Sequence, residues 1–138
     1  MQYIDSNVFI YAVLANEKTE PKARLSKQIL IGIAEGRMPA ATSSLTWDEV
    51  VWSIRHEISP EIAIEEGARF LEFPNLRILS IDEKVVNRAQ TLIETKKLKP
   101  RDSIHLACCM ENNISEIISD DKDFDMPVGI KRIPLEKA

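Results

Sequence analysis

The sequence predicts a single α/β domain built on a parallel β-sheet. Short apolar segments of strand length alternate with longer segments that carry apolar residues at helical spacing, the pattern of strands joined by crossover helices. The chain has 138 residues, which suits one domain, and its 44% hydrophobic and 29% charged residues are an ordinary globular balance. No repeat, low-complexity stretch or Gly/Ser linker divides it. We therefore expect one domain over residues 1–138.

The first strand is predicted at residues 2–4, where a short apolar segment ends at Asp5. A helix follows over about residues 8–15, because a polar side chain just before this apolar segment can accept hydrogen bonds from the first helical amides. The residues that can provide this cap are Ser6 and Asn7. A second helix begins at Pro21, which suits the first helical position, and ends before Gly36.

The middle of the chain predicts a second strand and a pair of helices. The strand covers residues 38–41, and the segment Thr46 to Glu49 has the pattern of a capping box that opens the third helix. The apolar stripe of this helix consists of Trp47, Val51, Ile54 and Ile58. Residues 59–61 then open a fourth helix that runs to about Phe73.

The last part of the chain predicts two further helices. The fifth begins within residues 80–83 and has the clearest amphipathic pattern, formed by Val85, Val86, Ala89, Leu92 and Ile93. Asp102 starts the sixth, whose segment from Leu106 to Met110 is apolar on every side, so we expect this helix to be central and buried. The remaining strands cover residues 76–79, 117–118 and 131–133, with the last at an edge of the sheet because Pro134 cannot donate to a ladder.

Several carboxylates should meet at one edge of this sheet. Asp5 and Asp121 each follow a predicted strand, and the carboxyl ends of parallel strands share an edge where ligands bind. Asp102 lies at a helix start, where backbone amides favour an anion. Two charges 4 Å apart repel by roughly 4 kcal/mol at an effective dielectric constant near 20. A divalent cation such as Mg²⁺ or Mn²⁺ would relieve this repulsion and could activate a water for phosphoryl chemistry.

Each acid also has a simpler explanation. Asp5 and Asp102 could only cap helices, Glu49 could only complete the capping box, and residues 120–125 could be a solvated loop. An EF-hand loop starting at Asp121 is excluded, because Met126 and Arg132 stand where that loop needs Gly and Glu. Glycine-rich nucleotide loops are absent from the sequence. A phosphoacceptor receiver domain is disfavoured, since a single Asp follows the first strand.

Charge and cysteine content narrow the function classes. With 18 basic and 22 acidic residues the formal net charge is −4, so any nucleic-acid contact must come from a local basic patch. Such a patch is predicted at Lys96, Lys97, Lys99 and Arg101. The adjacent Cys108 and Cys109 cannot form a disulfide framework, and the N-terminus does not resemble a secretory signal, so we expect a cytoplasmic protein. The longest apolar run is far below the roughly 20 residues of a membrane span.

Four segments in order resemble the motifs of PIN-domain ribonucleases. They are YIDSNVFIYA, TSSLTWDEVVW, PRDSIHLA and ISDDKDF, and together they span the chain. As a short single domain, the chain resembles a VapC toxin of a toxin–antitoxin pair. The resemblance implies a five-stranded parallel sheet flanked by helices on both faces. It also implies a Mg²⁺ or Mn²⁺ site that hydrolyses RNA, with catalytic and metal-binding acids at Asp5, Glu49, Asp102 and Asp121.

The neighbours of these acids are expected to support them or to contact RNA. The supporting candidates are Ser6, Asn7, Ser119, Asp120 and Asp123, and the doublet Asp120-Asp121 leaves open which of the two binds metal. Lys96, Lys97, Lys99 and Arg101 are candidates for holding the RNA backbone. His105, one helical turn after Asp102, is expected to be a packed or hydrogen-bonded histidine, with metal ligation as the alternative.

The resemblance further implies a homodimer and a cognate antitoxin that covers the acidic cleft. Apolar residues off the core stripes should lie at such contacts, and the candidates are Trp52, Phe70 and Phe73. Two other functions remain as alternatives: a stand-alone RNA-processing nuclease, and a non-catalytic interaction module on the same fold.

Overall fold

A computed structural model, which describes residues 1–126 and 128–138, has the predicted parallel sheet. Its strands are β1 (Gln2–Ile4), β2 (Ala40–Ser43), β3 (Leu76–Leu79), β4 (Glu116–Ile118) and β5 (Lys131–Ile133). They lie in the order β3-β2-β1-β4-β5, and every neighbouring pair is parallel. The N-terminal strand is therefore central, and it pairs with a strand from the other end of the chain.

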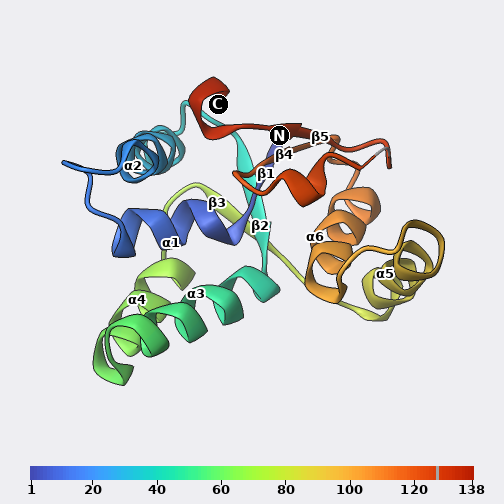
Figure 1. Ribbon diagram of the computed structural model, residues 1–138, viewed down its shortest axis with the longest axis horizontal. Coiled ribbons are helices and arrows are strands. Elements are labelled where there is room, and N and C mark those ends of the chain that lie inside the picture. The colour runs from blue at the N-terminus through green and yellow to red at the C-terminus, as the bar shows by residue number, and fades with distance from the viewer. Residues whose placement is uncertain (127) are drawn as a thin grey trace.

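Helices cover both faces of the sheet. They are α1 (Ser6–Leu14), α2 (Pro21–Ala34), α3 (Ser44–Glu57), α4 (Pro60–Leu71), α5 (Glu83–Lys96) and α6 (Pro100–Glu111). Figure 1 shows α5 and α6 together on one side and α1 to α4 on the other. Short 3-10 helices, η1 (Lys122–Phe124) and η2 (Leu135–Lys137), flank β5. None of the helices in the described ranges is long and apolar enough to cross a membrane.

The central strands supply two separate cores. Successive side chains of a strand point to opposite faces. Tyr3 and Ile117 accordingly pack against α5 and α6, whereas Ile4 and Ile118 pack toward α1 to α4. All four side chains are fully buried. This two-sided burial explains why two apolar residues follow one another in each strand, without alternation with polar residues.

Two boundaries near the N-terminus differ from the prediction. The N-cap of α1 is Asp5, whose Oδ1 accepts from the Ser6 amide at 2.7 Å, so capping by Ser6 or Asn7 was wrong. Strand β2 covers 40–43, two residues later than predicted. It extends into polar sequence because the Thr42 hydroxyl donates to the Ile4 carbonyl oxygen at 2.8 Å inside the core.

The predicted capping box of α3 was wrong, and its predicted apolar stripe was right only for Val51 and Ile54. This helix begins at Ser44, and the Thr46 hydroxyl lies inside it at 2.7 Å from the Thr42 hydroxyl. The buried side chains are Thr46, Val50 and Ile54, while Trp47 and Ile58 are exposed. Trp47 and Val51 instead face α4 at Gly67, where a Cβ would lie 3.0 Å from the Val51 Cγ2.

The later helices fit the prediction with smaller shifts. Helix α4 ends at Leu71, before the predicted Phe73. Helix α5 is capped by Asp82, whose carboxylate accepts from the Val85 amide, within the predicted start at residues 80–83. Helix α6 begins at Pro100, so Asp102 lies in its first turn. The segment 106–109 is fully buried, as predicted for a central helix.

Candidate active site

The predicted acids converge at the edge of the sheet where β1 and β4 end. Asp5 follows β1 and Asp121 follows β4, and these two strands are neighbours. The first turn of α6 brings Asp102 to this edge, and α3 brings Glu49. Ligand atoms of Asp5, Glu49 and His105 lie within 4.8 Å of one another, and so do those of Asp102, Asp121 and Asp123. We call these residues together the acid group.

Ser119 connects the two strand ends. Its hydroxyl donates to Asp5 Oδ2 at 2.6 Å and accepts from the Asp121 amide at 2.9 Å. It also accepts from Asn7 Nδ2 at 3.2 Å. One buried hydroxyl therefore fixes the carboxylate after β1 relative to the backbone after β4.

Asp5 is a buried carboxylate held by several donors. It is 5% exposed, and it accepts from Ser119 and from the Ser6 amide, with the Ser6 hydroxyl at 3.4 Å. Burial raises the pKa of Asp5, and the nearby His105 and Ser119 oppose this only in part. Such a rise is expected where a carboxylate faces other carboxylates out of water.

His105 is a buried, doubly hydrogen-bonded side chain, as expected. Its Nε2 lies 2.5 Å from Glu49 Oε1 and 3.7 Å from Asp5 Oδ1, and its Nδ1 lies 2.7 Å from the Tyr3 hydroxyl. Burial lowers its pKa, but the hydrogen bond to Glu49 and the charge of Asp5 outweigh this, so the net shift is upward. With both nitrogens protonated, Nδ1 donates to Tyr3, whose hydroxyl donates to Ser43 Oγ at 2.7 Å.

The pKa of Asp102 shows the effect of its buried position and of the neighbouring carboxylates. Burial and the neighbouring charges of Asp121 and Asp5 raise its pKa to about 6. Asp121 Oδ1 accepts from the Asp123 amide at 2.9 Å, and Asp123 forms an exposed ion pair with Lys99 at 3.2 Å.

Asp120 and Asp125 point away from the acid group. Asp120 Oδ2 accepts from the Tyr11 hydroxyl at 3.0 Å and pairs with Lys22 at 2.6 Å, so its pKa is lowered although partial burial alone would raise it. Asp125 forms two hydrogen bonds with Arg132, whose Nη1 also donates to the Ser119 carbonyl oxygen. Of the doublet 120–121, the structure therefore brings Asp121, and not Asp120, to the other acids.

The four predicted basic residues lie between α5 and the first turn of α6. All are exposed, while Leu98 between them is buried. Lys97 caps α5 in the left-handed conformation at φ 59°. Lys99 is paired with Asp123, which leaves Lys96, Lys97 and Arg101 without an ion pair among the residues described.

The residues present fit a hard divalent cation. Carboxylate and amide oxygens dominate the edge, and these are the ligands that Mg²⁺ and Mn²⁺ prefer. Asn7 Oδ1 is buried there without a hydrogen-bond partner in the described part of the chain. An unsatisfied buried carbonyl is costly, so its place beside the acids favours a bound ion or water. Both nitrogens of His105 are engaged by neighbours, which disfavours it as a ligand.

Tyr3 and Ser43 are parts of this site that the sequence analysis missed. Both lie on strands, in positions typical of ordinary core residues, and both are fully buried. The only sequence signal was the one-turn spacing of Asp102 and His105, because a buried histidine needs partners for both of its nitrogens.

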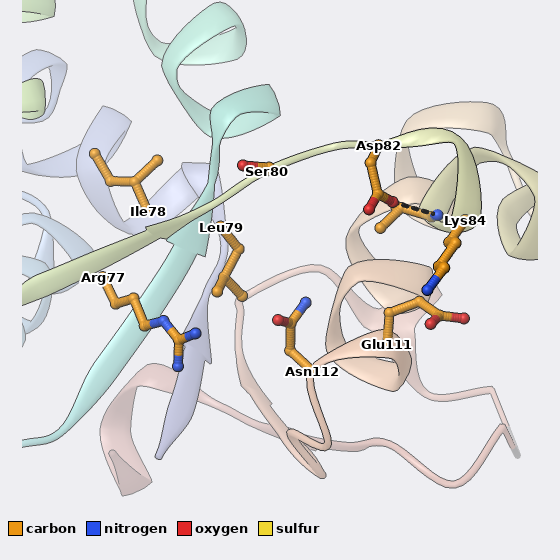
Figure 2. Close-up of a pocket in the computed structure, with 9 residues that line it drawn as sticks. Arg77, Ile78, Leu79, Ser80, Asp82, Lys84, Glu111 and Asn112 are labelled. Atoms are coloured by element: carbon orange, nitrogen blue, oxygen red, sulfur yellow. Dashed lines mark hydrogen bonds between the residues drawn. The ribbon is translucent and has the colours of Figure 1, made fainter.

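A separate pocket lies beside the outer edge of β3. It has a volume of about 360 Å³ and lies between β3, the start of α5 and the end of α6. Figure 2 shows Arg77, Ser80, Lys84 and Asn112 around it. No member of the acid group lines it, so this pocket is distinct from the candidate site.

Comparison with known families identifies a match over nearly the whole chain. The model of the PIN domain family matches residues 2–127. No curated protein sequence matches the chain.

Solved structures with a similar fold come from toxin–antitoxin systems. A toxin–antitoxin complex from Klebsiella pneumoniae is 23% identical with a TM-score of 0.66, over 94% of this chain and 95% of that chain. VapC20 of Mycobacterium tuberculosis, a toxin that cleaves the sarcin–ricin loop, is 14% identical with a TM-score of 0.74, over 91% and 93%. VapBC2 of Rickettsia felis, bound to promoter DNA, is 18% identical with a TM-score of 0.71, over 97% and 98%. At these low identities, the TM-scores show that the folds are similar.

Proposed function

Because the chain belongs to the PIN domain family, we propose that it is a metal-dependent endoribonuclease that hydrolyses RNA phosphodiester bonds. The observation that carries this proposal is the convergence of Asp5, Asp102 and Asp121 at the edge where β1 and β4 end. A carboxylate cluster of this kind is costly without a cation. The fold and the family match agree with this assignment.

In this proposal Asp5, Asp102 and Asp121 hold Mg²⁺ or Mn²⁺, and Glu49 completes the site directly or through water. The bound cation would activate a water molecule and stabilise the charge that develops on the phosphoryl group. Ser119 fixes the Asp5 carboxylate relative to the Asp121 backbone through its hydrogen bonds to both. Ser6 lies against the Asp5 carboxylate, and Asn7 donates to the Ser119 hydroxyl.

The remaining residues orient the acids or hold the substrate. His105 donates to Glu49 and fixes its carboxylate, because Tyr3 and Ser43 fix the ring in turn. Lys96, Lys97, Lys99 and Arg101 contact phosphates of the RNA. Asp120 and Asp123 act indirectly, through their ion pairs with Lys22 and Lys99.

We further propose that this one-domain protein, over residues 1–138, is the toxin of a toxin–antitoxin pair. The similar folds of toxin–antitoxin complexes support this. An antitoxin would cover the acid group, and the chain would act as a homodimer in the cytoplasm, where the free, buried Cys108 and Cys109 stay reduced. A gene for a small DNA-binding protein beside this one would distinguish a toxin from a stand-alone RNA-processing nuclease.

The test is cleavage of a single-stranded RNA with and without Mn²⁺. We expect Asp121→Asn to lower the cleavage rate at least 100-fold, because it removes a metal-binding charge while keeping the shape of the side chain. Asp125→Asn is the matched control, since it lies in the same acidic run but bonds to Arg132 on the surface. It should cleave like the wild type, and both variants should melt as folded proteins.

Two results would contradict the proposal. Wild-type protein that binds RNA but never cleaves it with Mn²⁺ or Mg²⁺ would favour the non-catalytic interaction module. Equal rates for Asp121→Asn and the wild type would place the chemistry elsewhere on the chain.

A further inference from the structure

We propose that Trp52 is a stacking platform for one unpaired base of the RNA substrate, next to the acid group. This inference rests on the proposed ribonuclease function and extends it to the class of substrate, which would be single-stranded RNA or an RNA loop.

Trp52 lies beside the candidate site on the same helix as Glu49. The two residues are three positions apart on α3, so they are neighbours on the helix surface. A small cavity of about 150 Å³ opens between them, lined by Ile10, Asp48, Glu49, Trp52, Ser53 and Arg101. This volume is well below the roughly 300 Å³ of the smallest drug-sized pockets, so it suits a single ring system.

The indole of Trp52 is both exposed and held in place. It is 59% exposed, and its ring stacks on His56 with 4.3 Å between centroids and 22° between planes. His56 covers one face of the indole, and Trp52 also lines the cavity. An aromatic ring with a fixed orientation loses little conformational entropy when a second ring stacks on it.

The exposure of Trp52 is not required by the fold. Trp47, one turn and a half earlier on α3, packs against α4 at Gly67. Trp52 is instead among the most exposed large apolar side chains of the described residues and belongs to neither core cluster. Its position next to Glu49 is therefore better explained by a ligand than by packing.

The charged side chains around the cavity are unlike the centre of a protein interface. Asp48, Glu49 and Arg101 line it, whereas the centres of protein interfaces are depleted of charged residues. Arg101 has no ion pair among the residues described and precedes Asp102, so it can bind the phosphate next to a base stacked on Trp52. A base in a duplex is already stacked on both faces, which restricts this binding mode to unpaired bases.

The experiment measures binding with the full chain in EDTA, so that cleavage does not interfere. Single-stranded RNA oligonucleotides carry 2-aminopurine at one position at a time, and its fluorescence falls when it stacks on an aromatic ring. We expect one position to be quenched by the wild type, close to the bond that is cut in a parallel reaction with Mn²⁺. Trp52→Phe should retain the quenching at this position.

Trp52→Ala should lose the quenching and bind single-stranded RNA roughly fivefold to a hundredfold more weakly, the range for one stacked base. Its affinity for a duplex of the same length should not change. Ile31→Ala is the matched control, because Ile31 is 51% exposed on α2 and does not line the cavity. Melting curves and light scattering on each variant report fold and oligomeric state.

Each other outcome overturns the inference in a recognisable way. If Trp52→Ala binds single strands like the wild type while the wild type cleaves RNA, stacking is wrong and the ribonuclease function stands. If Trp52→Ala dissociates an oligomer without changing RNA affinity, the residue belongs to a protein interface. If the wild type neither binds nor cleaves RNA, the proposed function fails and the inference fails with it.

Discussion

At the scale of single residues, the aspartates in the run 120–125 have opposite surroundings. Asp120 and Asp125 bond to cationic side chains, which lowers the pKa of each. Asp121 and Asp123 lie with Asp102, whose pKa is raised to about 6 by burial and by its acidic neighbours. The first pair is held by cationic side chains, whereas Asp121 adds to the repulsion at Asp102 and Asp123 also pairs with Lys99.

The repulsion at Asp102 predicts an unusual dependence of stability on pH. The pKa of an unfolded Asp is about 3.9, so between that value and about 6 the folded, metal-free protein binds more protons than the unfolded chain. Its free energy of unfolding therefore falls as pH rises through this window. Asp102→Asn should flatten this fall and raise the melting temperature at pH 7.5 in EDTA. Melting curves from pH 4.5 to 7.5 measure both effects.

Mn²⁺ should reverse the instability of the wild type. A cation that binds only the folded state at 100 times its dissociation constant adds about 2.7 kcal/mol, on the order of 10 °C in melting temperature for this size. Asp102→Asn should respond much less, and Asp125→Asn as strongly as the wild type. If Mn²⁺ does not change the melting temperature of any of the three proteins, the acids do not form a cation site.

The sequence predicts the acids of this site better than it predicts their support. Asp5 and Asp121 end strands of one parallel sheet, so their approach follows from topology alone. The chain from His105 through Tyr3 to Ser43 joins three separate elements by side-chain hydrogen bonds. No spacing along the chain encodes such a contact, because it depends on rotamers and on which faces meet.

At the scale of elements, the turn between α5 and α6 holds Lys97 in a left-handed conformation. This conformation at φ 59° costs a residue with a Cβ roughly 1 kcal/mol or more, and glycine avoids the cost. Lys97→Gly should therefore raise the free energy of unfolding by up to about 1 kcal/mol, after the gain in unfolded-chain entropy is subtracted. Asn113→Gly is the control at φ 55° and should gain less, because Asn tolerates this region. Urea unfolding of both variants measures the difference, and a destabilised Lys97→Gly would contradict the argument.

The same turn should make RNA binding depend on salt. Lys96 and Arg101 have no ion pair among the residues described, and removing one phosphate-binding side chain should reduce the slope of log affinity against log salt by about 0.7. The double variant Lys96→Ala/Arg101→Ala should thus flatten the slope by about 1.4, measured by anisotropy of a labelled RNA in EDTA. The charge-matched control is Arg77→Ala/Lys84→Ala, which changes the pocket beside β3 shown in Figure 2. A larger decrease of the slope in this control would mean that RNA follows the β3 edge.

The misplaced elements share a physical cause. Strand β2 ends in Thr42 and Ser43, which are residue types common in loops. Both are buried, and both form hydrogen bonds with residues of β1. Likewise Thr46 and Glu49 have the spacing of a local capping box but bond to Thr42 and His105 instead. Where polar side chains form hydrogen bonds with other elements, the local sequence pattern predicts the wrong strand end or helix cap.

At the scale of the whole molecule, α4 carries one stripe of exposed apolar side chains. Ile64, Ala68 and Leu71 are exposed at positions i, i+4 and i+7 of this helix, with Ile64 at 74% and Leu71 at 59%. The contact was expected on the fourth helix around Phe70 and Phe73. Phe70 is buried and both rings pack against Phe9, so the exposed side chains of this helix are the candidates. A stripe of this kind usually marks an interface, so a homodimer would use Ile64 and Leu71.

The prediction is that Ile64→Lys/Leu71→Glu shifts a dimer toward monomer, because it places charges in an apolar contact. Light scattering at tens of micromolar measures the mass, and Ile31→Lys, another exposed apolar side chain on α2, is the control. A wild type that is already monomeric at this concentration would show that α4 forms no such dimer.

The central place of β1 has a consequence for protein synthesis. Asp5 leaves the ribosome 114 residues before its partner Ser119. A nascent chain that has emerged only through α6 already carries Asp5, Glu49 and Asp102, yet it lacks β4, and β1 still has one open edge. Because the loop after β4 brings Asp121 and the Ser119 bridge, the acid group forms only after almost every other element has been made. Under the proposed function, a nascent chain that ends before β4 would therefore lack the complete metal site and would not cleave RNA.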